Sequence, residues 1–270
     1  MKIMIMTDME GCAGILNVDD WVIPEGRYYE KGKRFLTEEV NAAVAGFFEA
    51  GADEVVVVDG HGGGIDPEML DERALLSSGV AKPVWPWGLD KTFNGLAFVG
   101  QHAKAGTPYS HITHSGSFIR IDITINGISI GEYGNVALCA MELGIPTILA
   151  CGEQALAAEA AALTHGVVTV SVKHGILPDG LDALDCNAYS KAKLSAIHLS
   201  PHKARKLIKE GASNALLKLK HEPQAFSYPK LTPPYVLETK FRANGDKTAH
   251  LRRGEHPDSI IGLLNMQYSV

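Results

Sequence analysis

The chain has 270 residues, of which 46% are hydrophobic and 21% are charged, and its formal net charge is −6. These values are typical of an ordinary globular protein with a sizeable core, and the acidic balance argues against nucleic acid as a partner. No run approaches the ~20 apolar residues of a membrane span, so we expect no membrane partner.

The four cysteines are scattered, without a Cys-x-x-Cys pair, at Cys12, Cys139, Cys151 and Cys186. In a chain of this length such cysteines indicate reduced, mostly buried thiols, not a disulfide framework. The first apolar run is too short for a signal peptide. We therefore expect a cytoplasmic protein, with residues 1–270 forming a single domain.

Short apolar runs alternate with helical patterns along the chain. The strands predicted in chain order are Lys2–Met6, Glu54–Val58, Leu96–Val99, Ile119–Ile125, Ile128–Ile130, Thr147–Ala150, Val167–Val172 and Val236–Phe241, and the helices are Phe35–Ala50, Asn135–Leu143, Ala155–Leu163 and Pro201–Lys220. Runs such as Val55–Val58, apolar on both faces, favour a largely parallel central sheet covered by helices on both faces. The fold class is therefore α/β.

Two features depart from simple alternation. Asn126-Gly127 between two isoleucine-rich runs predicts a β-hairpin with a type I′ turn. The proline-rich stretch Glu222–Pro234 is expected to be a surface connector to a C-terminal β-containing subregion. Ser200 before Pro201 is typical of a helix N-cap.

The first predicted strand stops at two carboxylates, Asp8 and Glu10. Residues two apart on an extended chain point to the same side, so these acids project together. Two adjacent carboxylates repel each other unless a cation lies between them. The bland alternative is a pair of solvated acids, since acidic residues commonly cap the helix after a strand.

Three more strand ends carry similar chemistry. His61 follows the second strand, His102 follows the third, and Glu132 follows the second arm of the hairpin. Because ligand sites in α/β sheets lie outside the carboxyl ends of strands, we expect these side chains to converge with Asp8 and Glu10. Mixed His, Asp and Glu ligation suits zinc or another divalent transition metal, and five ligands favour a pair of ions with one bridging carboxylate.

Each residue also has an ordinary interpretation. His61 fits a flexible glycine-rich turn, His102 is one of eleven histidines, and Glu132 fits the first turn of a helix. The joint occurrence at four strand ends favours the metal site.

Five motifs occur in an order that resembles the DppA-type D-aminopeptidases, a family of dinuclear zinc peptidases. They are Thr7-Asp8-Met9-Glu10-Gly11, Asp59-Gly60-His61, Gly100-Gln101-His102-Ala103-Lys104-Ala105-Gly106-Thr107-Pro108, Thr113-His114-Ser115 and Gly131-Glu132-Tyr133-Gly134-Asn135. The similarity extends to about Phe241 and includes Leu199-Ser200-Pro201 and Leu231-Thr232-Pro233-Pro234.

The resemblance implies that residues 1–270 form a single α/β metallopeptidase domain. It implies a metal-dependent aminopeptidase that releases an N-terminal D-amino acid from short peptides through an activated water. It implies that Asp8, Glu10, His61, His102 and Glu132 bind two zinc ions, with Asp8 bridging. His114 matches the family's proposed nucleophile, although its chemistry also suits a general base, a general acid or an oxyanion donor. His111 is a weaker second candidate. The family's assembly implies a homo-oligomer, a decamer that encloses its active sites.

Two segments depart from the family's pattern. Gly175–Ala192 resembles an insertion, and the tail after Pro257 is too short for a long C-terminal helix. Both bear on the substrate pocket and on the oligomer.

Other functions have some support in the sequence. His61-Gly62-Gly63-Gly64 resembles the oxyanion loop of esterases, and Gly127–Gly131 matches Gly-x-Ser-x-Gly, which would make Ser129 the nucleophile of a serine esterase. The β-branched neighbours of Ser129 favour a strand over the strained turn that this chemistry needs. The same glycine loop lacks the spacing of phosphate-binding motifs. A metal-dependent hydrolase of other small amides and a non-enzymatic metal-binding protein complete the alternatives.

Overall fold

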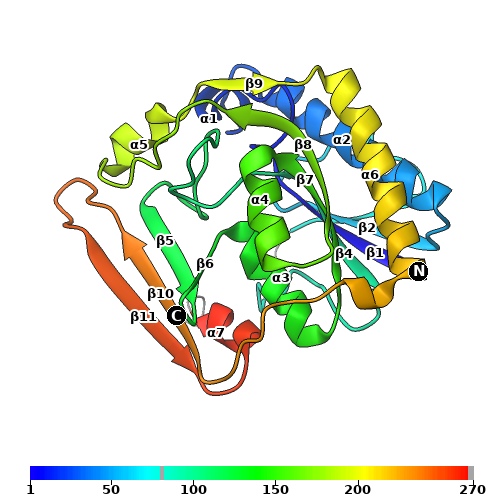
Figure 1. Cartoon of the computed structure of the whole chain (residues 1–270). Coiled ribbons are helices and arrows are strands. Elements are labelled where there is room, and N and C mark those ends of the chain that lie inside the picture. Colours follow the sequence, from blue (N-terminus) through cyan, green and yellow to red (C-terminus); the bar gives the residue numbers. More distant parts are fainter. Residues whose placement is uncertain (80–81, 267–270) are drawn as a thin grey trace.

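The computed structural model describes residues 1–79 and 82–266 and is shown in Figure 1. Its strands are β1 (Lys2–Thr7), β2 (Glu54–Val58), β3 (Ala74–Ser77), β4 (Gly95–Gln101), β5 (Arg120–Ile125), β6 (Ile128–Ile130), β7 (Thr147–Glu153), β8 (Val168–Gly175), β9 (Ala196–His198), β10 (Tyr235–Phe241) and β11 (His250–His256). The α-helices are α1 (Val18–Trp21), α2 (Tyr29–Glu49), α3 (Glu132–Leu143), α4 (Gln154–Leu163), α5 (Cys186–Ala192), α6 (Pro201–His221) and α7 (Ile260–Met266), and Pro223–Ala225 forms a 3-10 turn.

A central sheet of seven strands has the order β3-β2-β1-β4-β7-β8-β9. All neighbouring pairs are parallel except β8 and β9, which are antiparallel. Strand β1 is an interior strand, and Ile3 pairs with Val55 on one side and with Gly95 on the other. The strand order reverses beside β1, which is where α/β sheets place their ligand sites.

Helices cover both faces of this sheet, as expected from its doubly apolar strands. Ile3 and Ile5 point to the face covered by α2 and α6, which pack against each other. Met4 and Met6 point to the other face, which α3 and α4 cover. The alternation of neighbouring residues between two cores is the period-2 geometry of a strand buried on both sides.

A second, antiparallel sheet has the order β11-β10-β5-β6 and lies beside the main body, with α7 packed against it (Figure 1). Its β5–β6 hairpin turns at Asn126 and Gly127, whose φ angles of 49° and 80° are those of the predicted type I′ turn. The hairpin and the C-terminal β region are thus confirmed, and they form one sheet.

The predicted helices all form, and Ser200 accepts a hydrogen bond from the Lys203 N–H as the expected N-cap. Helix α2 begins at Tyr29, six residues before the predicted Phe35. The missed turns contain Gly32, which sequence patterns treat as a helix breaker. A Cβ at Gly32 would lie 2.5 Å from the Trp21 carbonyl oxygen, so the glycine is required by close packing.

Several short or polar elements were not predicted, namely β3, β9, β11, α1, α5 and α7. Helix α5 lies within Gly175–Ala192, and the tail after Pro257 contains the seven-residue α7 in place of a long helix. All four cysteines are free, and three of them are buried, as expected. Within the described ranges, no helix combines the length and the hydropathy needed to cross a membrane.

Candidate metal centre

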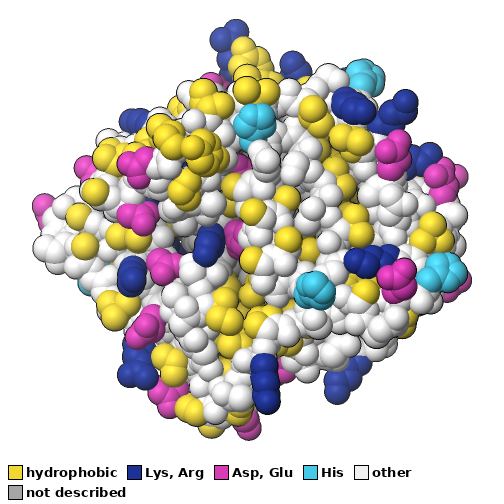
Figure 2. Space-filling view, in the orientation of Figure 1, with side chains coloured by type: hydrophobic (Ala, Val, Ile, Leu, Met, Phe, Trp, Pro, Cys, Tyr) yellow, Lys and Arg dark blue, Asp and Glu magenta, His cyan; other side chains and the backbone are white. Residues whose placement is uncertain are grey.

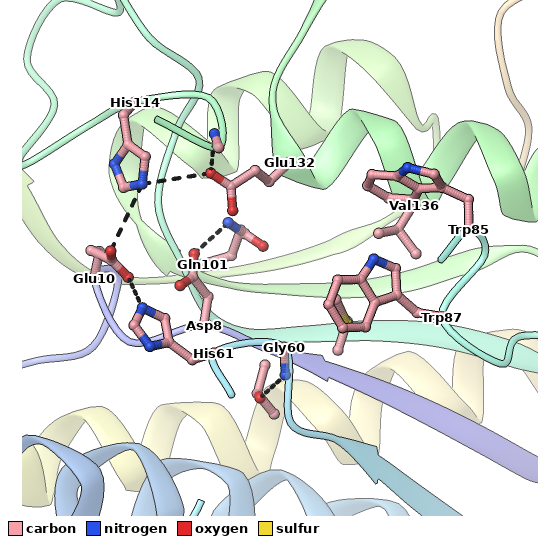
Figure 3. A pocket seen from close by; sticks show the side chains of 13 residues that line it. Asp8, Glu10, Gly60, His61, Trp85, Trp87, Gln101, His114, Glu132 and Val136 are labelled. Atoms are coloured by element: carbon pink, nitrogen blue, oxygen red, sulfur yellow. Dashed lines mark hydrogen bonds and ion pairs between the residues drawn. The ribbon is translucent and has the colours of Figure 1, made fainter. Parts of the chain in front are cut away.

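The carboxyl ends of β1, β2 and β4 meet at one edge of the central sheet, and the start of α3 faces them. Asp8 and Glu10 follow β1, His61 follows β2, His102 follows β4, and Glu132 is the first residue of α3. The hairpin arm before Glu132 lies in the second sheet, so this carboxylate reaches the site from α3 and not from a strand of the central sheet. All five predicted ligand residues converge, together with His114. Figure 3 shows Asp8, Glu10, His61, Glu132 and His114 pointing toward one another.

The Asp8 and Glu10 segment is held by close backbone contact with β4. The Asp8 N–H donates to the Val99 carbonyl at 3.0 Å, and the Gly11 N–H donates to the Gly100 carbonyl at 2.7 Å. Gly100 has a φ of 77°, and a Cβ there would lie 2.0 Å from the Asp8 carbonyl oxygen, so only glycine allows this approach. Both carboxylates are consequently buried, with 6% and 4% exposure.

His61 is positioned by the carboxylate of Asp59. This carboxylate accepts hydrogen bonds from the N–H groups of Gly63 at 2.6 Å, Gly64 at 3.2 Å and His61 at 3.3 Å. The glycine-rich loop is therefore wrapped around a side chain of its own, which leaves His61 directed at Glu10 with Nε2 3.3 Å from Glu10 Oε2. The contacts with Asp59 explain the glycine-rich loop, so no bound phosphate is needed to explain it.

The two remaining histidines have fixed tautomers. His102 Nδ1 lies 2.7 Å from the Ala103 carbonyl and His114 Nδ1 lies 3.1 Å from the Ile112 carbonyl. Because a carbonyl only accepts, each Nδ1 carries the proton and each Nε2 presents a lone pair in the neutral ring. His102 Nε2 lies 3.4 Å from both Asp8 Oδ2 and Glu132 Oε1, and His114 Nε2 lies 3.6 Å from Glu132 Oε1.

These separations of 3.3 to 3.6 Å between facing donor atoms suit a shared cation. Glu10 Oε2 and His102 Nε2 are buried without a hydrogen-bond partner among the described residues. Two ligand atoms bound at ~2.1 Å to a tetrahedral ion lie ~3.4 Å apart. The six residues form two such groups, Asp8, Glu10 and His61 in one and His102, His114 and Glu132 in the other, each with its ligand atoms within 4.8 Å of one another.

The pKa values of the groups at the centre reflect the close approach of several carboxylates. Burial and the adjacent Glu10 raise the pKa of Asp8 well above its usual value. Burial also disfavours charge on His61 and on Glu132, but opposite charges outweigh it. Glu10 raises the pKa of His61 to about 9, and His102 with His114 lowers that of Glu132 to about 2. Protons on the histidines thus compensate the negative charge of the carboxylates. A bound cation would compensate the same charge.

A cavity of about 250 Å³ opens onto these groups. Asp8, Glu10, His61, His114 and Glu132 line one side of it, and Trp85, Trp87 and Val136 lie on the other (Figure 3). Met6 also lines the cavity. Sequence patterns gave no indication of the tryptophans, which come from the irregular segment between β3 and β4. They also missed Gln101, whose Nε2 donates to Asp8 Oδ2 at 2.6 Å and orients that carboxylate.

Comparison with known proteins identifies the family. Residues 1–251 match the model of the peptidase family M55, described as D-aminopeptidase. The chain belongs to this family. It is 36% identical over 252 residues to a D-aminopeptidase from Bacillus subtilis strain 168, covering 91% of this chain and 83% of that protein.

A solved structure from Bacillus subtilis has the same fold. It is described as the Zn-dependent D-aminopeptidase DppA from Bacillus subtilis, a self-compartmentalizing protease, and matches with a TM-score of 0.83 and 28% identity over 99% of this chain and 96% of that one. The expected α/β fold is therefore confirmed.

The buried carboxylate of Glu153 holds the loop that carries His102 and His114. Glu153, at the end of β7, accepts a hydrogen bond from the Ala103 N–H and another from the His111 N–H, both at 2.7 Å. The loop between β4 and β5 is long, and Glu153 fixes it at two points with a side chain that is fully buried. The signal in the sequence was a charged residue that ends an otherwise apolar run.

His111 and Ser129 lie outside the centre. His111 is fully buried, contacts the His198 ring and has Nε2 3.2 Å from the Leu16 carbonyl, so it does not line the cavity. Ser129 occupies the middle of β6, where its hydroxyl contacts Asp122 and Lys104 at 2.5 and 2.7 Å. A serine in a paired strand cannot form the sharp turn of an esterase nucleophile.

Proposed function

We propose that this M55 protein is a zinc-dependent aminopeptidase that removes an N-terminal D-amino acid from short peptides. The family, the 36% identical D-aminopeptidase and the zinc-dependent structural neighbour support the activity. The observation that carries the metal dependence is the spacing of the facing donor atoms, 3.3 to 3.4 Å between His61 and Glu10 and between His102 and its two carboxylates.

We assign the ligands of two zinc ions to Asp8, Glu10, His61, His102 and Glu132. The donor set is one that zinc prefers, and a bound cation would give a partner to Glu10 Oε2 and His102 Nε2, which are buried without a hydrogen bond among the described residues. Asp8 belongs to the first group, yet its Oδ2 lies 3.4 Å from His102 Nε2 of the second. This position between the groups supports Asp8 as the bridging ligand.

Bound zinc would supply an acidified water and polarisation of the scissile carbonyl. The chain's own contribution to proton transfer is His114. Its Nδ1 is held by the Ile112 carbonyl, and burial together with the adjacent His102 lowers its pKa, which favours a neutral ring with a free lone pair on Nε2. We therefore assign His114 the role of general base, which can return the proton to the leaving amine.

We further propose that the protein forms a homo-oligomer, a decamer in keeping with the family resemblance, and is cytoplasmic. The description of the structural neighbour as self-compartmentalizing supports assembly, and the four free cysteines support a reducing compartment. Native mass spectrometry of the zinc-loaded protein tests this proposal, since a monomer at micromolar concentration would contradict it.

The activity is tested with a panel of D- and L-dipeptides and simple amides on zinc-loaded wild type and His114→Ala. We expect release of an N-terminal D-residue by the wild type and loss of at least about 100-fold in kcat for the variant. His221→Ala, which alters an exposed histidine at the end of α6, is the matched control and should retain activity. Failure of the zinc-loaded wild type to cleave any member of the panel would contradict the proposed function.

A further inference from the structure

The candidate metal centre occupies one side of its cavity, and the opposite side is apolar. Trp85, Trp87 and Val136 form this second side, which we call the tryptophan wall (Figure 3). Among the described residues that line the cavity, every charged or ionisable side chain belongs to the metal centre. A substrate group that enters the cavity therefore contacts carboxylates and histidines of the metal centre on one side and apolar side chains on the other.

The tryptophan wall is fixed in place by the C-terminal helix. The backbone N–H of Trp85 donates to Asn265 Oδ1 at 3.1 Å, and Asn265 Nδ2 donates back to the Trp85 backbone carbonyl at 3.0 Å. Asn265 lies on α7, so this short helix anchors the segment that bounds the cavity. Trp85 itself is only 7% exposed and packs in the same core as Leu89 and Leu264.

Trp87 is the less buried of the two indoles and is held in an unusual conformation. Its φ is 62°, a region that bulky residues rarely adopt, and its backbone N–H donates to the Val84 carbonyl at 2.8 Å. The two indoles meet edge to face, with ring centroids 6.4 Å apart and planes at 83°. Strained backbone that presents a large apolar side chain beside a candidate reaction centre is typical of a residue selected for function.

Resting on the proposed function, we infer that the tryptophan wall is the subsite for the side chain of the substrate's N-terminal residue, and that it selects uncharged apolar side chains. The carbonyl to be cleaved must lie at the metal centre, and the side chain of that same residue must lie within one side-chain length of it. A Lys or Glu side chain placed against the wall would lose its hydration without gaining a counter-charge from it.

The volume of the cavity also limits the size of the substrate side chain that the subsite accepts. The space of about 250 Å³ must hold the N-terminal residue and the start of the next, which leaves room for a side chain of the size of leucine. Removal of the Trp87 ring enlarges the space and removes apolar contact. Its effect should grow with the size of the apolar side chain and should be small for alanine.

The test uses X-Ala dipeptides in both chiral series, with X being Ala, Leu, Phe, Lys or Glu, on zinc-loaded wild type, Trp87→Ala and Phe93→Leu. Phe93 packs in the same core as Trp85 but does not line the cavity, so it is the matched control. In the wild type we expect kcat/KM for Leu to exceed that for Lys and Glu by at least about 10-fold. Trp87→Ala should reduce kcat/KM for Leu by about 10- to 100-fold, mostly through KM, with the Ala peptide changed by less than about 3-fold.

Equal kcat/KM for Leu, Lys and Glu in the wild type, or an equal loss for every X in Trp87→Ala, would overturn the inference. A binding measurement separates this outcome from failure of the proposed function. Calorimetry with leucine hydroxamate and lysine hydroxamate of both configurations requires no cleavage. If no peptide is cleaved but the leucine compound binds the wild type at least about 10-fold more tightly than it binds Trp87→Ala, the subsite stands and the peptidase activity fails.

Discussion

The imidazole rings of His102 and His114 stack with their centroids 4.2 Å apart and their planes at 23°. Both Nε2 atoms face the same carboxylate oxygen, Glu132 Oε1, at 3.4 and 3.6 Å. Backbone carbonyls hold both Nδ1 protons, so in the neutral rings two lone pairs point at an anion. This arrangement needs a proton or a metal ion between the three groups, and the following predictions depend on it.

Asp8→Ala should lose both zinc ions, whereas Glu10→Ala should mainly weaken one. Asp8 lies between the two groups of ligands, while Glu10 faces His61 most closely. Elemental analysis after dialysis against buffered zinc measures the difference. Asp246→Ala, which alters an exposed acid in the turn between β10 and β11, is the control and should keep the full metal content. Identical metal contents of the two site variants would rule out Asp8 as the bridge.

Glu153→Ala should lower both the zinc content and kcat/KM. The substitution leaves the buried N–H groups of Ala103 and His111 without an acceptor, at a cost of about 2 to 4 kcal/mol in unfolding free energy. Because these N–H groups fix the loop that carries His102 and His114, kcat/KM should fall by at least about 10-fold.

Glu153→Gln keeps one carboxamide oxygen and should give an intermediate result, which separates positioning from a general loss of folding. Gln154→Ala, on the exposed neighbour, serves as the control. Full activity of Glu153→Ala at an unchanged melting temperature would show that the loop does not depend on this carboxylate.

Ser129→Ala should retain activity within about 3-fold, because Ser129 contacts Asp122 and Lys104 on a paired strand and does not line the cavity. Addition of a chelator to the same variant should abolish hydrolysis. The opposite pattern, an inactive variant and chelator-resistant wild type, would favour the serine esterase.

Glu39→Gln should stabilise the protein at alkaline pH. Burial raises the pKa of Glu39 to about 7, so between its usual value near 4.5 and pH 7 the folded chain binds more protons than the unfolded chain. Unfolding free energy contributed by this group therefore falls as pH rises through that interval, and the penalty is fully present above pH 7.

A glutamine keeps the acceptor for the Ala13 N–H, which lies 2.9 Å from Glu39 Oε1, and removes the charge. At pH 8 we expect a gain of about 1 to 3 kcal/mol in unfolding free energy, and at pH 4 no gain. Thermal melts at both pH values check this prediction, with Glu30→Gln on the exposed face of the same helix as control. A gain of equal size at both pH values would contradict the titration of Glu39.

Much of the site was predictable because it lies at strand ends. Parallel strands bring their carboxyl ends to one edge, so the positions of Asp8, Glu10, His61 and His102 in the sequence determined their convergence. Glu132 converged for a different reason, since α3 and not the hairpin strand delivers it. The ordinary interpretations of these residues were reasonable singly, and only their joint placement favours a metal site.

The missed features depend on tertiary contacts that leave little pattern in the sequence. Trp85 and Trp87 lie in an irregular segment whose position depends on Asn265, 180 residues away. Strand β11 is exposed and polar, so it lacks the alternation that identifies strands. Gly32 reads as a helix breaker until the approach of Trp21 is known. The inferred insertion at Gly175–Ala192 stays a prediction.

The number of zinc ions bound per chain tests the central claim most directly. The protein should be stripped with a chelator, reloaded with excess zinc and passed through a desalting column before elemental analysis. Five assigned ligand residues in two adjacent groups of donor atoms predict two zinc ions per chain, with hydrolysis restored on reloading. A folded preparation that retains no zinc after this treatment would contradict the account.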